Sequence, residues 1–397
     1  MANNLTAFSP EYRSNRIQRL LKKSLVSREI ANMEERALLS NGIKVHRPYH
    51  SDIKVNSYTK GTAVTPQDIT ATDEYLTVDQ TKEATVYVDQ IDVIQNKYDQ
   101  ANVLTERIAY ALKRDIDGAF LAQVVNASYT MDDADFGWTS WVAITPSTSN
   151  IVKLFALAEA KMNQNNIEDT KPRYAVITPA VKAVVQQSLI FNGFRKADEG
   201  LDGMFMGNGF MGRYMNFNIY SSNNVLHTCV LTSSSAPTAT NTVVVNGVTF
   251  TFVSSLGTTA GNVLFSDEAT SLDNLASAIN GGSWAGTTYV EVSAANRLKL
   301  NQAWVAAVSD ATHTVTITSQ WPITYSETHA AGSFGTQYAQ CLFGQMNTID
   351  MVIQQDVTVQ QNKVPDKTGY NYLCYDLYGI KTFTEGAVRN MKVKIAV

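Results

Sequence analysis

The first apolar pattern in the chain predicts a helical arm over residues 10–40. A stripe at helical spacing starts at Ile17, Leu20 and Leu21 and continues loosely toward residue 37. Asn41-Gly42 supplies a stop, because both residues tolerate the left-handed conformation in which many helices end. We therefore expect an amphipathic helix before residue 42.

Residues 43–91 show a different pattern, which is polar, Thr-rich and alternating. The apolar positions of this alternation are Leu76, Val78, Ala84, Val86 and Val88. The pattern predicts a long two-stranded hairpin with little apolar surface on either face. Such a hairpin is marginally stable alone, and its unpaired edges favour association. We expect it to fold by lying on a neighbouring subunit.

The strongest helical pattern lies between Asp99 and Val125. Its apolar residues recur every four positions, at Leu104, Ile108, Leu112, Ile116 and Phe120. A helix of this length would span about 40 Å, since each residue adds 1.5 Å. The sequence therefore predicts one helix longer than most helices of globular proteins.

Residues 149–224 read as a compact α/β unit, with a helix around Ile151–Met162 and a strand at Tyr174–Thr178. Pro179 follows the strand and suits the first turn of a second helix. A further strand is expected over Tyr214–Tyr220. At the far end of the chain, Val393, Ile395 and Val397 alternate, which predicts a final strand held in a sheet.

The composition changes sharply between Thr228 and Gly335. These 108 residues hold 32 Ser and Thr but only two basic residues, Arg297 and Lys299. Such a shift predicts an inserted domain. Its expected elements are a hairpin with an Asn246-Gly247 turn, an amphipathic helix through Leu272 and Ile279, and strands near Tyr289–Val292 and Thr314–Thr318. We expect this β-rich domain to fold by itself.

The bulk composition excludes several classes. A chain of 397 residues with 44% apolar residues can bury a full core, and its net charge of −4 excludes a polycation that neutralises DNA by bulk charge. Cys229, Cys341 and Cys374 are too few and too scattered for a disulfide framework, so we expect a reducing compartment. No signal-peptide core or membrane-length apolar run is visible, so we expect no membrane association.

Charge is nevertheless uneven along the chain. Residues 1–48 carry nine Lys and Arg against four Glu, a balance of +5 that leaves −9 for the remainder. Two interpretations stay open. The run is either a solvated helical face or an arm that touches an acidic partner or DNA, with Arg16, Arg19 and Lys22 as candidate contacts.

Motifs for chemistry are weak. Gly207–Gly212 matches G-x-G-x-x-G, but a strand follows it, and the acidic residue that a dinucleotide site needs is missing. Asp132, Asp133 and Asp135 lack the spacing of a calcium loop. His227 and Cys229 have no second pair at zinc spacing, and no nucleophile motif is present. We predict no enzyme activity, cofactor or metal.

The order of the parts resembles the major capsid proteins of tailed double-stranded DNA bacteriophages, a fold shared with herpesvirus capsids. Individual strings resemble the branch with podovirus-type coats, and the likeness covers roughly residues 30–225 and 338–397. The strings are LLSNGIKVHRPY, VNSYTKGTAVTPQDIT, YAVITPAVKAVV, GNGFMGRYMNFNIYSSNNV and DLYGIKTFTEGAVRNMKVKIAV.

This resemblance implies an α+β fold with an N-terminal arm, an extended loop, a spine helix, and axial and peripheral domains. The β-rich insertion is not part of the common fold. The implied boundaries are 1–42 for the arm, 43–91 for the loop with part of the peripheral domain, 92–148 for the peripheral domain with the spine helix, 149–227 and 336–362 for the axial domain, 228–335 for the insertion, and 363–397 for the C-terminal strands of the peripheral domain.

The function implied is self-assembly. Hexamers and pentamers would form an icosahedral shell around packaged double-stranded DNA, without reading its sequence. The shell would be assembled in the host cytoplasm with a scaffolding protein and a portal protein. The candidate inter-subunit contacts are Arg16, Arg19, Lys22, Lys54, Tyr58, Lys60 and Asp68.

Two further possibilities accompany this reading. Some capsids of this fold cross-link a loop lysine to a neighbour's asparagine, but the nearest branch generally lacks that chemistry, so we do not expect it of Lys54 or Lys60. The alternative function is a tail-associated or adhesin-like binding protein whose working part is the insertion.

Overall fold

The computed structural model describes most of the chain. The described residues are 25–36, 39, 42–51, 53–64, 66–95, 100–137, 143–167, 171–191, 210–309, 313–365 and 367–397. Arg16, Arg19 and Lys22 therefore lie outside the described residues, as does most of the predicted arm helix.

The described part of the arm is not one helix, so that prediction is wrong there. Helix α1 covers only Ser27–Ile30, and a 3-10 turn follows at Glu34–Arg36. Between them the chain is extended, because the Asn32 backbone forms a bridge with Asp350 and its side-chain amide donates to the Asp350 carboxylate at 2.8 Å. A tertiary contact thus overrides the helical pattern.

A ten-stranded mixed sheet forms the body of the molecule. Its main path runs in the order β12 (Ala306–Ser309), β13 (Thr314–Ser319), β8 (Leu226–Ser233), β16, β5, β7 and β6. Off this path, β15 (Gly332–Phe334) pairs with β8, and β19 pairs with β16 and β4. Helices α4 (Ile151–Gln164) and α5 (Pro179–Phe191) pack on it, with Pro179 opening α5 as predicted. The strands that lie in this body are β4 (Tyr129–Met131), β5 (Arg173–Ile177), β6 (Phe210–Tyr214), β7 (Phe217–Ser221), β16 (Tyr338–Gln345) and β19 (Asn390–Ala396).

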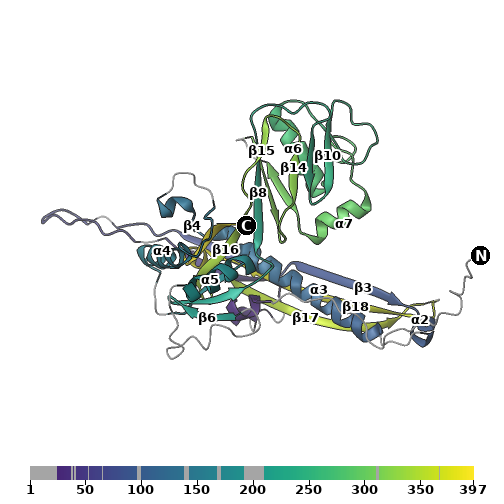
Figure 1. Cartoon of the computed structure of the whole chain (residues 1–397). Coiled ribbons are helices and arrows are strands. Elements are labelled where there is room, and N and C mark those ends of the chain that lie inside the picture. Colours follow the sequence, from purple (N-terminus) through teal and green to yellow (C-terminus); the bar gives the residue numbers. More distant parts are fainter. Residues whose placement is uncertain are drawn as a thin grey trace, which may run out of the picture.

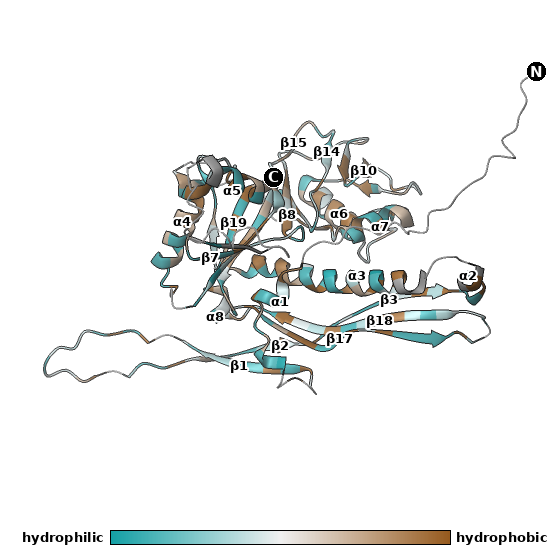
Figure 2. Ribbon diagram, turned by 60° about the horizontal axis from the view of Figure 1, so that its bottom comes forward, coloured by the Kyte–Doolittle hydropathy of each residue, from teal (hydrophilic) through white to brown (hydrophobic). Residues whose placement is uncertain are grey.

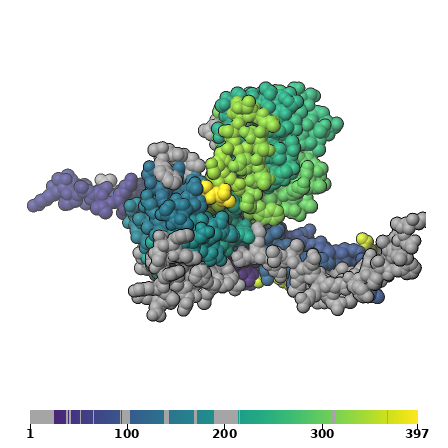
Figure 3. Space-filling view, viewed as in Figure 1, coloured from purple at the N-terminus to yellow at the C-terminus, as the bar shows by residue number. Residues whose placement is uncertain are grey.

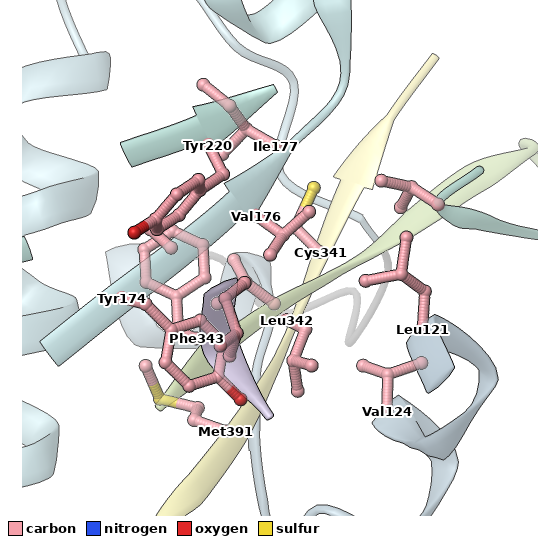
Figure 4. Close-up of a cluster of buried hydrophobic side chains, with 14 of the residues drawn as sticks. Leu121, Val124, Tyr174, Val176, Ile177, Tyr220, Cys341, Leu342, Phe343 and Met391 are labelled. Carbon is pink, nitrogen blue, oxygen red and sulfur yellow. The ribbon is translucent and has the colours of Figure 1, made fainter. Parts of the chain in front are cut away.

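The main hydrophobic core lies between this sheet, its helices and the end of the long helix. Figure 4 shows Tyr174 and Val176 from β5 meeting Phe343 from β16 and Met391 from β19. The predicted strand over Tyr214–Tyr220 is in fact two strands, because Met215 and Asn216 adopt left-handed conformations and turn the chain between β6 and β7. The last strand pairs with β16, as the alternation predicted.

The predicted long helix is α3 (Gln100–Ala122), and a 3-10 turn at Gln123–Asn126 extends it. It lies along a three-stranded sheet of order β17 (Asp350–Lys363), β18 (Tyr370–Lys381) and β3 (Gln80–Val88), as Figures 1 and 2 show. Ile108 and Leu112 of α3 pack on Cys374 of β18. Two short helices follow strands of this sheet along the chain. Helix α2 (Gln90–Gln95) comes after β3, and helix α8 (Thr384–Ala387) comes after β18.

The hairpin is shorter than predicted. Strands β1 (Lys44–His50) and β2 (Ala71–Thr77) pair with each other, but β3 belongs to the three-stranded sheet. The alternation at Ala84 and Val86 therefore faces α3 and does not continue the hairpin. That part of the hairpin prediction is wrong, because the partner strand β18 lies almost 300 residues further along the chain.

A second hydrophobic core lies within residues 229–334, which we call the β-rich unit. It stands above α3 in Figure 1 and includes Phe250, Leu275 and Ile317. Its elements are β8 (Leu226–Ser233), β9 (Thr242–Val245), β10 (Val248–Val253), β11 (Asn262–Leu264), α6 (Glu268–Asn280), α7 (Ala294–Gln302), β12 (Ala306–Ser309), β13 (Thr314–Ser319), β14 (Tyr325–Glu327) and β15 (Gly332–Phe334).

Most of the elements predicted for the β-rich unit are confirmed. Asn246 and Gly247 turn the β9–β10 hairpin, and α6 ends at Gly281 in the left-handed conformation. The strand expected at Tyr289–Val292 is absent from this described segment, where Tyr289 forms only isolated bridges to Val263 and Ala285. Strand β8 pairs with β13 inside the unit and with β16 outside it, so the sheet is continuous across the junction.

Candidate assembly surfaces

The tip of the hairpin projects far beyond the rest of the molecule (Figure 3). The described residues between Ser51 and Thr70 form no strand, and hydrogen bonds such as that from the Ser51 amide to the Thr70 carbonyl join the two arms. The Lys54 amide donates to the Gln67 side-chain oxygen at 3.1 Å, and the Gln67 amide donates to the Lys54 carbonyl at 2.5 Å. The projecting loop thus has few contacts of its own to fix it.

This loop also exposes apolar side chains, which the alternating pattern missed. Val55 is fully exposed, and Val64 is 76% exposed. Ile53, Tyr58 and Ile69 are exposed as well. The prediction of little apolar surface is therefore wrong for the tip. Several large exposed apolar side chains on one projecting loop indicate a surface that another molecule covers.

The predicted contact residues on this loop are all exposed. Lys54, Tyr58, Lys60 and Asp68 lie along the projecting segment, so the structure gathers them on one element. Arg16, Arg19 and Lys22 lie outside the described residues.

An ion cluster fixes the base of the hairpin. The Arg47 guanidinium on β1 donates to both carboxylate oxygens of Asp350 at 3.2 Å and to Glu35 at 2.5 Å. Its charged carbon also lies 4.4 Å from the ring centre of Phe383. Burial raises the pKa of Asp350, although the Arg47 charge opposes that shift. The bidentate geometry sets the direction in which the hairpin leaves the body.

A buried carboxylate joins three other parts of the chain. Asp117 on α3 accepts hydrogen bonds from the backbone amides of Val26 and Ser27 at 2.8 and 2.9 Å. Its second oxygen accepts from the Asn224 side chain at 2.6 Å. Asp117 therefore ties the arm and the approach to β8 onto the spine helix.

The β-rich unit contacts the spine helix α3 near its C-terminal end. Gln320 lies against Gly118 of α3, where a Cβ atom would collide with the Gln320 amide. The Lys82 ammonium of β3 lies 5.7 Å from the ring centre of Trp304, which belongs to the unit. Two contacts thus link the unit to elements outside its own core.

The weak chemical motifs have structural explanations. Asp132 and Asp135 form a reciprocal cap at the 3-10 turn Asp133–Phe136, and Lys161 pairs with Asp135 at 2.7 Å. Burial raises the pKa of Cys229 to about 12, which disfavours the thiolate that zinc requires. The described half of the glycine motif enters strand β6 and not a helix.

The part of the chain that the structure describes contains no cluster of three or more His, Cys, Asp or Glu side chains able to hold a metal ion. Among the same residues, no helix is both long and apolar enough to cross a membrane.

Solved structures of phage proteins share this arrangement along the whole chain. A structure from Mycobacterium phage Che8 has 15% identity and a TM-score of 0.57, with 98% of each chain covered. The capsid structure of the cyanophage P-SCSP1u has 13% identity and a TM-score of 0.52, covering 100% of this chain and 95% of its own. The capsid of Myoviridae phage XM1 has 10% identity and a TM-score of 0.51, covering 100% of both. The fold is therefore that of phage capsid proteins.

The sequence family agrees with the fold. The family model for phage capsid protein, Phage_capsid_4, matches residues 74–262, from strand β2 to strand β11. No curated protein matches the chain significantly. The phage capsid family and the shared fold thus agree over the middle of the chain.

Proposed function

We propose that the subunit assembles into hexamers and pentamers by laying its hairpin tip on a neighbour. The observation that carries this proposal is the row of exposed apolar side chains on a loop that has no core beneath it. Covering them removes apolar surface from water at about 25 cal/mol per Å². Each contact can be modest, because every subunit holds several partners at once and their effects multiply.

The charged and polar residues of the tip complete this contact. Lys54, Lys60 and Asp68 form its polar rim, and Tyr58 offers an aromatic ring with a hydrogen-bonding end. Arg47 at the base keeps the hairpin in one direction, so the loop reaches the neighbour without a large ordering cost.

The finer classification rests on the sequence strings. LLSNGIKVHRPY and YAVITPAVKAVV support the podovirus-type branch of tailed-phage coats. That branch implies a scaffolding protein, a portal protein and packaged double-stranded DNA that is bound without sequence specificity. The arm, with its balance of +5, is the proposed contact for an acidic partner or for DNA.

We also propose that residues 228–335 form an inserted domain on the outer face of the capsomer, within the domain boundaries that the resemblance implies. Its separate core supports this proposal. So does its composition, because two basic residues among 108 cannot neutralise DNA phosphates on an inner surface.

The test of hairpin exchange replaces residues 53–69 with an Asn-Gly turn, which keeps the β1–β2 pairing and the Arg47 cluster. The variant should remain folded and soluble but form no closed shells under the electron microscope. A matched control lengthens the Asn246-Gly247 turn of the β-rich unit by two glycines and should leave shell formation intact. Normal particles from the hairpin variant would refute the proposal.

A further inference from the structure

A buried carboxylate lies between the spine helix and the three-stranded sheet. Asp376 on β18 is fully buried, and neither of its carboxylate oxygens has a partner at full hydrogen-bond geometry in the described structure, although the backbone amide of Lys82 lies near enough to favour the charged form. It stands between Cys374 and Tyr378 on the face of β18 that meets α3. A buried ionised group without hydrogen bonds is costly, so the position demands an explanation.

A second carboxylate faces it from the helix. Asp115 on α3 accepts a hydrogen bond from the Tyr378 hydroxyl at 3.0 Å. Burial raises the pKa of Asp376 to about 6, and the charge of Asp115 adds to the rise. Burial also raises the pKa of Asp115, which Lys82 and Tyr378 partly offset. The charge of Asp115 thus hinders the ionisation of Asp376 across the helix–sheet interface.

The other charged groups around the pair do not neutralise it fully. Lys82 of β3 pairs in register with Asp376, but its ammonium lies over the Trp304 ring. Asp356 of β17 adds a third negative charge and is engaged by Arg28 of the arm at 2.7 Å. From α3 itself, the charge of Lys113 acts on Cys374 and the charge of Arg114 acts on Asp115.

We propose that Asp115 and Asp376 form a proton-operated clasp that sets how firmly the spine helix α3 is held on strand β18. With one proton on the pair, the interface carries a single negative charge and a new hydrogen-bond donor. When that proton leaves, two like charges repel each other in a poorly solvated interface. The packing between helix and sheet is therefore stronger in mild acid than at neutral pH.

The direction of the pH effect follows from proton linkage. Burial raises the pKa of Asp376 in the folded protein to about 6, whereas the ordinary pKa of aspartate is 3.8. Between these values the folded state binds more protons than the unfolded state, so stability falls as pH rises. The contribution is present in mild acid and is lost as pH rises through about 6.

The test follows thermal unfolding of the full-length, unassembled chain, so it does not depend on hairpin exchange. Wild type should unfold about 2–5 °C higher at about pH 5 than at about pH 7.5. Asp376→Asn should raise the midpoint at the higher pH and remove the difference, because the amide is always neutral. Asp68→Asn, an exposed carboxylate on the hairpin, serves as the control and should keep the wild-type difference.

A second variant covers the case in which Asp376→Asn does not fold. Asp115→Asn keeps an oxygen that can accept the Tyr378 hydrogen bond and removes the repelling charge, so it should also flatten the pH dependence. An unchanged pH difference in both variants overturns the proposal. The proposal is also overturned if the variants that fold have a lower unfolding midpoint than wild type at about pH 7.5. In that case the ionised carboxylates would not destabilise the fold at that pH.

Discussion

The side chain of Gln320 fills the space that a Cβ atom on Gly118 would occupy. Gln320 belongs to the β-rich unit and is only 4% exposed, and Gly118 lies in the interior of the spine helix. A glycine inside a helix costs about 1 kcal/mol relative to alanine. Its presence in α3 is accounted for by the close approach of the unit.

Because of this contact, we predict that the effect of Gly118→Ala on the free energy of unfolding changes sign when Gln320 is truncated. Gly118→Ala alone should destabilise the chain, because the buried Gln320 amide must move. In a Gln320→Ala background the same substitution should stabilise by about 1 kcal/mol, since only the helix propensity remains. Denaturant unfolding measures both steps, and equal effects in the two backgrounds would show that the residues are not coupled.

Removing the Asp117 carboxylate should be costly. Asp117→Ala leaves the amides of Val26 and Ser27 and the side chain of Asn224 without their acceptor, and we expect a loss of about 2–4 kcal/mol. The comparison is Glu83→Ala, an exposed carboxylate on strand β3, which should cost less than about 0.5 kcal/mol. Similar losses in the two variants would contradict the assigned role of Asp117.

The hairpin surface predicts an assembly defect without a folding defect. Val55→Asp puts a charge on a fully exposed side chain, so the unfolding midpoint should not change, but the yield of closed particles should fall at least tenfold. Val308→Asp places the same charge on an exposed valine of the β-rich unit and should assemble normally. Light scattering during assembly measures the yield, and equal behaviour of the two variants would argue against hairpin exchange.

The acid limb of the stability curve should depend on Glu74. Its carboxylate accepts hydrogen bonds from the backbone amide of Thr384 at 3.0 Å and from the Thr384 hydroxyl, which lower its pKa. A lowered pKa stabilises the fold above the ordinary value of 4.5, and this contribution is lost as pH falls through the folded value. Thr384→Val should therefore flatten the loss of stability in acid. An identical acid limb in variant and wild type would exclude this role.

The arm prediction concerns residues outside the described structure. Reversing Arg16, Arg19 and Lys22 to Glu should weaken scaffold binding or assembly and leave the unfolding midpoint nearly unchanged, as for exposed charges. Co-sedimentation with the proposed scaffolding protein measures binding, and calorimetry measures stability. A large loss of stability would mean that the arm belongs to the core.

Local patterns predicted the elements whose partners are close in sequence. The period of α3, the strand before Pro179, and the Asn246-Gly247 hairpin are of this kind, because propensity and turn chemistry decide them. The pairing of β3 with β18 and the bridge of Asn32 to Asp350 depend on residues about 300 positions away. No periodicity reports such contacts, so the sequence alone predicts a hairpin that is too long and an arm that is too helical.

The candidate functional residues also fall into a group that the sequence predicts and a group that it does not. Lys54, Tyr58, Lys60 and Asp68 were placed on the projecting loop from its position alone, and their role as contacts remains a proposal. The clasp residues Asp115 and Asp376 left no signal in the sequence. A single aspartate on a helix or a strand is usually exposed to solvent, so the sequence predicts nothing unusual at either position. Only the packing of α3 on β18 shows that Asp376 is buried.

The most direct test of the central claim is a cryo-electron microscopy map of the assembled particle. Closed icosahedral shells are expected, with density for residues 53–69 lying on an adjacent subunit and the β-rich unit standing on the outer surface. Hairpin density that touches only its own subunit, or a β-rich unit facing the packaged DNA, would contradict this account of how the shell is held together.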